Sequence, residues 1–330
     1  MNLTIQNNNN QINNEYCDLS IIIINWNAAD VISNCLESIK NADENISYET
    51  LLVDNASTDN SIDLIRSQYP WVHLIPNCKN IGFARANNLA IERARGRYFL
   101  LLNPDTEIYH HTLTKLINYA DNHLKIGCIG PKILNPDYSV QRSCWKGFPD
   151  LKMALSDAFY LWKFPNLPFI NEIEFSNEQL NNIIDVDHLL GACILIRRKT
   201  WDEVGEFDKN FFIFFEETDW CYRAKLCSWR IIYYPDSIII HLGEHSVHQK
   251  PEINIPIYYQ SYIKFYKKHH SDKWSHIFCL EILIALAAIV RIILWQFRSL
   301  KEVRIYKKSH AMQRGYLKVL RNVFSNSFEE

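Results

Sequence analysis

The chain has 330 residues, of which 48% are hydrophobic and 13% are aromatic, and its formal net charge is −2. A chain of this size and composition can bury one large core or two smaller ones, which excludes a wholly disordered protein. The nine cysteines are scattered and form no Cys-x-x-Cys pair. Their odd number and spacing argue against a disulfide framework or a structural zinc site and favour a reducing cytoplasm.

The charge is unevenly distributed along the chain. Residues 261–330 hold 13 Lys and Arg against 5 Asp and Glu, a net charge of +8, which leaves −10 on the first 260 residues. Nucleic-acid binding is one interpretation of such a basic region. Its cations flank an apolar block at residues 277–297, however, which favours an anionic membrane surface as the partner and no nucleic acid.

The first 14 residues contain seven Asn and no Lys or Arg. They have neither the basic start nor the apolar run of a signal peptide. We therefore expect a disordered, Asn-rich tail over residues 1–17.

Short apolar runs alternate with helix-like stretches from residue 19 to residue 103. We expect buried parallel strands at residues 20–25, 50–54, 72–76 and 98–103, with helices at residues 31–39, 61–68 and 83–94. This is the pattern of a doubly wound α/β domain, in which ligands bind at the carboxyl ends of the strands. Polar side chains follow each predicted strand: Asn25 and Asn27, Asp54 and Asn55, Asn77 and Asn80, and Asn103 and Asp105.

The sequence divides into a regular half at residues 18–126 and a less regular half of the same domain at residues 127–256. In the second half we expect strands at residues 128–134, 186–196 and 230–241. An aromatic, turn-rich region at residues 145–175 lies between the first two and resembles a variable lid or acceptor loop. Residues 257–330 form a basic, helical third part.

Three segments of the first half are candidates for donor binding. Asp54 could accept hydrogen bonds from a nucleobase or ribose. Gly82 lies between Asn80 and Asn87 at a loop-to-helix junction, where a glycine lets the backbone approach a ligand, although an ordinary helix start gives the same pattern. The Asn103-Pro104-Asp105 segment puts a carboxylate at a strand end, and an Asx-type turn is the alternative interpretation.

A cluster of acids in the second half is the candidate for general base. Glu216, Glu217 and Asp219 follow five aromatic or apolar residues, so at least one of their pKa values should be raised. The alternative is a solvated helix N-terminus in which Asp219 pairs with Arg223, and for Asp219 we favour this pairing. His241 follows an apolar strand, where it could ligate a divalent metal or be a structural histidine.

Taken in order, these segments resemble glycosyltransferase family 2, and within it the bacterial rhamnosyltransferase-like branch that assembles surface polysaccharides. The resemblance covers residues 19–266. It rests on Ile24-Asn25-Trp26-Asn27, Val53-Asp54-Asn55-Ala56-Ser57-Thr58-Asp59, Asn80-Ile81-Gly82-Phe83-Ala84, Leu102-Asn103-Pro104-Asp105, Gly191-Ala192 with Arg197-Arg198, Val204-Gly205-Glu206-Phe207-Asp208 and Phe215-Glu216-Glu217-Thr218-Asp219.

The resemblance implies a GT-A fold, a Rossmann-like and mostly parallel sheet with flanking helices. Residues 18–126 would then be its nucleotide-sugar-binding half and residues 127–256 its acceptor and catalytic half. It also implies an inverting transfer, dependent on Mg²⁺ or Mn²⁺, from a nucleoside-diphosphate sugar to a glycan or lipid-linked acceptor. The donor would be dTDP-L-rhamnose. Donor-binding residues would be Asn25, Asn27, Asp54, Asn55, Asn80, Gly82, Asn87, Asn103 and Asp105.

The same resemblance assigns roles to four residues. Asp105 corresponds to the metal-binding acid of the Asp-x-Asp motif, in which Asn103 replaces the first acid, and His241 corresponds to a later metal ligand. Glu217 lies where the family usually has an aspartate base, with Glu216 and Asp219 as rivals. Two alternatives remain open, namely a sugar nucleotidyltransferase and an inactive sugar-nucleotide-binding protein. A dinucleotide enzyme is disfavoured because no Gly-x-Gly-x-x-Gly follows the first strand.

The apolar block at residues 277–297 has three possible structures. Its 21 residues could just span a bilayer, but basic residues lie on both sides of it, which the positive-inside rule disfavours for a span. An in-plane helix keeps both flanks in the cytoplasm, and a soluble core helix is the third possibility. We expect a cytoplasmic protein that is peripheral at the inner face of the cell membrane.

Overall fold

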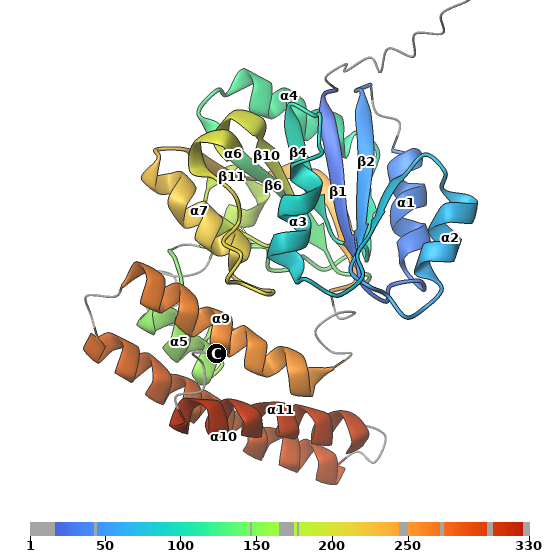
Figure 1. Ribbon diagram of the computed structural model, residues 1–330. Coiled ribbons are helices and arrows are strands. Elements are labelled where there is room, and N and C mark those ends of the chain that lie inside the picture. The colour runs from blue at the N-terminus through green and yellow to red at the C-terminus, as the bar shows by residue number, and fades with distance from the viewer. Residues whose placement is uncertain are drawn as a thin grey trace, which may run out of the picture.

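The computed structural model describes residues 17–42, 45–145, 147–164, 175–176, 178–243, 250–270, 274–301 and 306–325 (Figure 1). Except for Cys17, the tail expected over residues 1–17 lies outside the described residues. The aromatic region expected at residues 145–175 is described only in part.

A nine-stranded mixed sheet forms the centre of the α/β domain, in the order β3-β2-β1-β4-β10-β6-β11-β5, with β8 paired to β11. Strands β1 to β4 are parallel to their neighbours within this group, whereas β10 runs antiparallel to both β4 and β6. The strands of this sheet are β1 (Leu19–Asn25), β2 (Tyr48–Asp54), β3 (His73–Pro76), β4 (Tyr98–Leu102), β5 (Thr106–Ile108), β6 (Ile126–Leu134), β8 (Ile184–Asp185), β10 (Cys193–Arg197) and β11 (Arg230–His241).

Helices cover both faces of the sheet because its strands are apolar on both sides. In β1, Ile21 and Ile23 belong to the core beneath α1, α2 and α4, while Ile22 and Ile24 belong to the core beneath α3, α6 and α7. Successive side chains of a strand point to opposite faces, so a continuous apolar run supplies both cores. The helices are α1 (Ile32–Lys40), α2 (Ser61–Gln68), α3 (Phe83–Ile91), α4 (Thr112–Asn122), α6 (Arg198–Val204) and α7 (Glu216–Leu226).

A separate layer of helices lies against one end of this domain (Figure 1). It has its own hydrophobic core, to which Phe211 and Phe215 of the α/β domain also contribute. The helices of this layer are α5 (Leu151–Ala158), α9 (Pro251–His269), α10 (Trp274–Lys301) and α11 (Tyr306–Phe324). By length and composition α10 could cross a membrane, and 33% of its most apolar window is buried in the protein.

The predicted α/β class, the expected elements of the first half and the strand at residues 230–241 are confirmed, with boundaries shifted by a few residues. The single strand expected at residues 186–196 is wrong. A turn at Gly191 divides it into β9 (His188–Leu189), which pairs with β7 (Cys144–Trp145) in a separate ladder, and β10 of the main sheet. Helix α9 begins at Pro251 and crosses the boundary that we expected between residues 256 and 257.

Candidate active site

A cavity of about 540 Å³ opens at the carboxyl ends of the parallel strands. Its walls come from these strand ends, from the segment before α7 and from the first turns of α9. The lining residues are Ile24, Trp26, Asn55, Asn80, Gly82, Phe83, Asn103, Pro104, Asp105, Gln141, Leu190, Gly191, Ala192, Phe212, Ile213, Phe214, Glu216, Glu217, His241, Gly243, Lys250, Ile253, Asn254 and Ile257.

Asp105 and His241 meet in this cavity although 135 residues separate them. Strand β5 begins immediately after Asp105 and runs antiparallel to β11, with Thr106 opposite His241. This register brings His241 Nε2 to 3.4 Å from Asp105 Oδ1 and to 3.3 Å from the Asn103 side-chain nitrogen. Both side chains are largely buried. The predicted pairing of an acid with a histidine at this edge of the sheet is therefore present.

Gln141 fixes the orientation of the His241 ring. Its Oε1 lies 2.7 Å from His241 Nδ1, and its own Nε2 donates to Asn135 Oδ1 at 2.9 Å. An oxygen acceptor at Nδ1 requires the proton on that nitrogen, so the Nε2 lone pair faces Asp105 and Asn103. Sequence reasoning missed Gln141, since it lies in irregular chain 100 residues before His241.

The donors of this pair fit a divalent cation. A carboxylate and a neutral imidazole are both common ligands of Mn²⁺, and a second-shell acceptor at Nδ1 is usual for a ligating histidine. Among the described residues, no group of three or more His, Cys, Asp or Glu could hold a metal. Asp105 and His241 are thus two candidate ligands that the described residues bring together.

Glu216 and Glu217 begin α7 and reach the same cavity. Burial raises the pKa of Glu217 to about 7, while a backbone hydrogen bond from Gly191 acts in the opposite direction. Burial and the neighbouring Glu217 carboxylate raise the pKa of Glu216 well above its ordinary range. One oxygen of each carboxyl is buried without a hydrogen-bond partner. Near neutral pH, Glu217 can therefore accept a proton, whereas the shift of the Glu216 pKa favours its protonated form.

A strained turn presents this pair of acids. Phe214 and Phe215 adopt left-handed backbone angles, with φ of 70° and 69°, directly before α7. Bulky residues rarely take this conformation unless the surroundings impose it. Here the aromatic rings of α9 do so: Phe215 stacks on Tyr262 at 5.1 Å, and Phe214 packs edge-on against Tyr258 at 5.7 Å. Helix α9 thereby holds the start of α7 in place.

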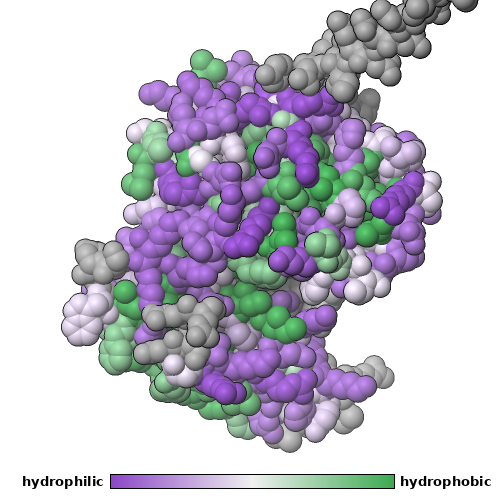
Figure 2. Space-filling model, viewed as in Figure 1, coloured by the Kyte–Doolittle hydropathy of each residue, from purple (hydrophilic) through white to green (hydrophobic). Residues whose placement is uncertain are grey.

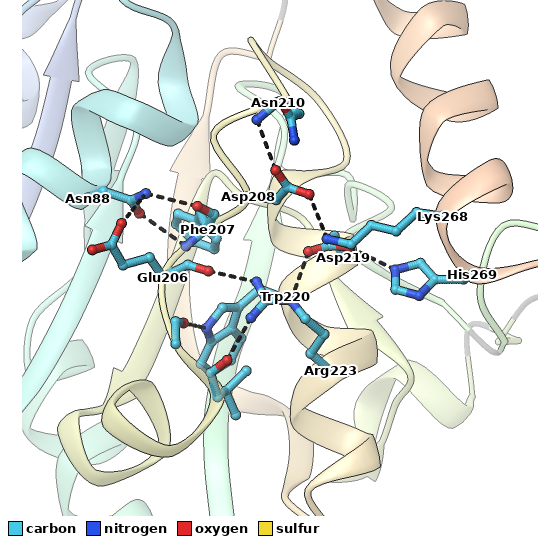
Figure 3. A network of polar contacts seen from close by, with 12 residues as sticks. Asn88, Glu206, Phe207, Asp208, Asn210, Asp219, Trp220, Arg223, Lys268 and His269 are labelled. Atoms are coloured by element: carbon cyan, nitrogen blue, oxygen red, sulfur yellow. Dashed lines mark hydrogen bonds and ion pairs between the residues drawn. The ribbon is translucent and has the colours of Figure 1, made fainter.

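Asp219 does not line the cavity and belongs to a buried ionic network between α7 and α9 (Figure 3). Its carboxylate contacts Arg223 at 2.9 Å and both Lys268 and His269 at 2.8 Å. Although burial opposes ionisation, hydrogen bonds from His269 and Lys268 hold the pKa of Asp219 below its usual value. The predicted pairing with Arg223 is confirmed, and the arrangement does not bring Asp219 to Glu216 and Glu217 in the cavity.

The expected donor-binding residues fall into two groups. Asn55, Asn80, Gly82, Asn103 and Asp105 line the cavity. The other four lie outside its lining and make hydrogen bonds within the protein. Asn25 donates to Asp54 across the ends of β1 and β2 at 2.7 Å, Asp54 accepts from the Ser57 backbone at 2.9 Å, and Asn27 accepts from the Thr58 backbone at 2.7 Å. Asn87 donates to the Phe83 carbonyl within α3 at 2.9 Å.

Gly82 permits a close approach within the protein. Its φ is +86°, and a Cβ placed there would lie 2.5 Å from the Phe212 carbonyl oxygen. That carbonyl accepts a hydrogen bond from the Phe83 backbone at 2.6 Å. The segment that carries Phe212 crosses over the start of α3 and leaves no room for a side chain at residue 82. This contact explains the glycine in part, in addition to any approach of a ligand.

Other features expected near the site contribute less. Phe148, from the aromatic region expected to be a lid or acceptor loop, packs among His188, Tyr222 and Phe265. A second pocket of about 480 Å³ lies where β4 begins at Tyr98 and the antiparallel β10 ends at Arg197, the opposite end of the strands from Asp105.

Comparison with known proteins supports an enzymatic role for this site. The model of glycosyl transferase family 2 matches residues 20–205. The chain is 26% identical to an N-acetylglucosaminyl-diphospho-decaprenol L-rhamnosyltransferase of Mycobacterium tuberculosis, over 78% of this chain and 86% of that protein. It is also 26% identical to rhamnosyltransferase WbbL of Escherichia coli K12, over 68% of this chain and 83% of that one.

Solved structures share the fold. The mannosyltransferase PcManGT from Pyrobaculum calidifontis superimposes with a TM-score of 0.55 at 16% identity, over 96% of this chain and 89% of that one. GalNAc-T7 superimposes with a TM-score of 0.54 at 14% identity. The match covers 77% of this chain and 48% of GalNAc-T7. The predicted GT-A fold is confirmed, and the chain is a glycosyltransferase that belongs to glycosyl transferase family 2.

Proposed function

We propose that the protein is an inverting glycosyltransferase that moves a sugar, L-rhamnose by preference, from a nucleoside diphosphate to a lipid-linked acceptor. The observation that carries this proposal is the single cavity that brings the Asp105 and His241 pair together with Glu217. The rhamnosyl donor and the lipid-linked acceptor are supported by the names of the mycobacterial and Escherichia coli relatives.

Glu217 is the proposed general base. A base works best when its pKa lies near the working pH, and burial raises the pKa of Glu217 to about 7. Burial and the Glu217 carboxylate raise the pKa of Glu216 well above its ordinary range, and Asp219 is held in the network of α7 and α9. As the acceptor hydroxyl attacks the anomeric carbon, its proton passes to a Glu217 oxygen while the bond to the diphosphate breaks. Attack from the face opposite the leaving group inverts the configuration.

Asp105 and His241 are the proposed ligands of a divalent cation, and structures of PcManGT and GalNAc-T7 contain Mn²⁺. When bound, such an ion would neutralise the negative charge that develops on the leaving diphosphate. Within the protein, Gln141 keeps the Nε2 lone pair of His241 available, and Asn103 donates to the same nitrogen. Asn55 and Asn80 line the cavity. Because the Asn55 amide already bonds to Gly82 and Asn77, the Asn80 side-chain nitrogen is the proposed donor to the nucleotide.

We further propose that transfer takes place at the inner face of the cell membrane, because an acceptor attached to a polyprenyl chain is confined to a bilayer. The relative from Mycobacterium tuberculosis supports this through the diphospho-decaprenol in its name. The basic, apolar helices at the end of the chain are consistent with this location.

The test begins with the purified protein and a panel of nucleotide sugars, including dTDP-L-rhamnose, UDP-N-acetylglucosamine and GDP-mannose. Thermal stabilisation in the presence of Mn²⁺ identifies the donor, since a ligand raises apparent stability according to its affinity. Transfer to a polyprenyl-diphosphate-linked sugar is then followed by mass spectrometry, and the anomeric configuration by NMR. Stabilisation without turnover would indicate an inactive binding protein, and a retained configuration would contradict Glu217 as a base.

A further inference from the structure

Helix α10 presents a long hydrophobic face to solvent. Between Phe278 and Leu294 every exposed residue is apolar or a cysteine. Spacings of three and four residues place them along one side of the helix for about five turns. Figure 2 shows hydrophobic side chains along the lower left edge of the molecule, where α10 lies. The large exposed residues of this face are Phe278, Ile282, Leu286, Ile289, Ile293, Leu294 and Phe297.

Helix α11 extends this face. Gln313 donates to the Gln296 side chain of α10 at 3.0 Å, which marks the flank of α11 that is turned toward α10. Three large residues share this flank, because their distances from Gln313 are close to whole numbers of helical turns. They are Tyr306, seven residues before it, Leu317, four residues after it, and Phe324, eleven residues after it. All three are more than half exposed. The exposed hydrophobic side chains of the two helices thus form one surface.

A row of cations borders this hydrophobic surface. Lys307, Arg314, Lys318 and Arg321 are exposed at spacings of seven, four and three residues, which places them on the next side of α11. Lys318 donates to the Glu252 carbonyl of α9 at 3.1 Å, so this row lies on the side toward the catalytic domain. Hydrophobic residues below and cations above are what a helix in the interface of an anionic bilayer requires.

Arg291 holds α10 against the protein and opposes a transmembrane orientation. Its guanidinium is buried and donates to the Asp157 carboxylate at 2.9 Å and to the Asp157 carbonyl at 2.8 Å. The rings of Tyr160 and Tyr316 lie 4.7 and 5.9 Å from it. A span would remove Arg291 from these partners and carry it into hydrocarbon, which is unfavourable for a charged side chain.

We propose that α10 and α11 form a docking surface that lies in the plane of an anionic bilayer, with the cation row at the depth of the lipid headgroups. The sign of that row argues for anionic lipid over a second copy of the chain, whose identical cations would be repelled. This inference is independent of the proposed reaction, because binding to vesicles needs no nucleotide sugar.

The test is flotation of the full chain with vesicles of phosphatidylcholine alone and with vesicles that also contain phosphatidylglycerol. The wild type should float mainly with the anionic vesicles. The Leu286→Glu/Ile289→Glu variant should lose at least about tenfold in affinity, because it places two charges on the hydrophobic face. The Lys307→Gln/Arg321→Gln variant should bind more weakly to anionic vesicles only, with a smaller dependence on salt.

Matched controls carry the same changes elsewhere on the surface. Leu124→Glu/Leu226→Glu alters two exposed leucines of the catalytic domain, and Lys40→Gln/Lys125→Gln removes two exposed lysines there. Both should bind like the wild type, and circular dichroism confirms folding of every variant. Failure of the wild type to bind anionic vesicles, or equal binding by Leu286→Glu/Ile289→Glu, overturns the proposal. Dimers that dissociate in this variant, without vesicle binding by the wild type, would instead assign the surface to a second copy.

A separate measurement distinguishes an in-plane helix from a span. Cysteines introduced as Ser275→Cys and Arg298→Cys mark the two ends of α10. When each variant is added to the outside of sealed vesicles, both introduced cysteines should react with a membrane-impermeant maleimide. The labelling of the native cysteines, measured in the wild type, is subtracted. Protection of one end alone would show a span and overturn the in-plane arrangement.

Discussion

His241 donates through Nδ1 to Gln141 Oε1 at 2.7 Å, and Gln141 is itself held by a hydrogen bond to Asn135. This chain of side chains leaves the Nε2 lone pair of His241 directed toward Asp105. Gln141 thus determines which nitrogen of the histidine can act as a ligand.

Gln141→Ala should therefore weaken the binding of Mn²⁺ by about 10- to 100-fold, since loss of a second-shell partner of a ligating histidine has this effect. Titration of the free protein with Mn²⁺, followed by electron paramagnetic resonance, measures the change without a need for turnover. Gln141→Glu, which keeps an oxygen at Nδ1, should retain most of the affinity. The control Gln68→Ala removes an exposed glutamine of α2 and should have no effect. Unchanged Mn²⁺ affinity in Gln141→Ala would exclude the positioning role.

Glu217→Gln should reduce kcat by about 10³-fold, within the range usual for loss of a general base. In the wild type, kcat/KM should rise with pH and level off above about 7, because burial raises the pKa of Glu217 to about 7 and the base must be ionised. The variant should show no such step. If Glu216→Gln were the inactive variant and Glu217→Gln the active one, the two roles would have to be exchanged.

The same substitution should stabilise the fold in alkaline solution. The folded-state pKa of Glu217 lies above its ordinary value of 4.5, so ionisation costs stability as the pH rises from about 4.5 to 7, and the full cost remains above that. Glu217→Gln should therefore be more stable than the wild type at pH 8 by about 3 kcal/mol, with the difference vanishing below pH 4. Urea unfolding at the two pH values measures both quantities.

Asp219→Asn should destabilise the protein by about 3 kcal/mol at pH 7, because it leaves buried cations without their counterion. The folded-state pKa of Asp219 lies below its ordinary value of 3.8, so the stabilisation is present above that pH and is lost as the pH falls through the folded-state value. The control Asp121→Asn breaks a more exposed ion pair with Arg97 and should cost less than about 1 kcal/mol. Equal effects of the two changes would argue against the network of Asp219.

Gly82→Ala should cost about 3 kcal/mol, because it combines a left-handed φ with a Cβ only 2.5 Å from the Phe212 carbonyl. Gly205 has the same φ of +86° with nothing within 4 Å of such a Cβ, so Gly205→Ala isolates the cost of the φ alone, about 1 kcal/mol. Chemical denaturation gives both values. Gly82→Ala should also raise the KM for the donor, since Gly82 and Phe212 line the cavity.

The fold of the first half could be predicted because its strands are continuous apolar runs followed by polar residues at their carboxyl ends. The pairing of Asp105 with His241 could be expected only from a resemblance to a family, since it depends on the register of β5 and β11. Gln141 carried no signal, because it lies in irregular chain and its function arises from a contact over 100 residues.

The conformation before α7 could not be predicted either. Phe214 and Phe215 are poor candidates for left-handed backbone angles by local preference, and only the aromatic packing of α9 imposes them. In the same way, sequence spacing identified Arg223 as a partner of Asp219, whereas Lys268 and His269 lie about 50 residues further along the chain.

Helix α9 has a consequence for how this enzyme can be divided. Ile253, Asn254 and Ile257 form a wall of the cavity, and Tyr262 supports the strained turn before Glu216. The opposite partners of α9 are the helices of the proposed membrane surface, with α11 packed along it. Attachment to the bilayer and assembly of the catalytic centre therefore share one structural element. A truncated protein that contains only the α/β domain would therefore lack part of the catalytic centre. A tilt of α10 and α11 at the lipid surface would move α9 and thereby change the position of Glu217.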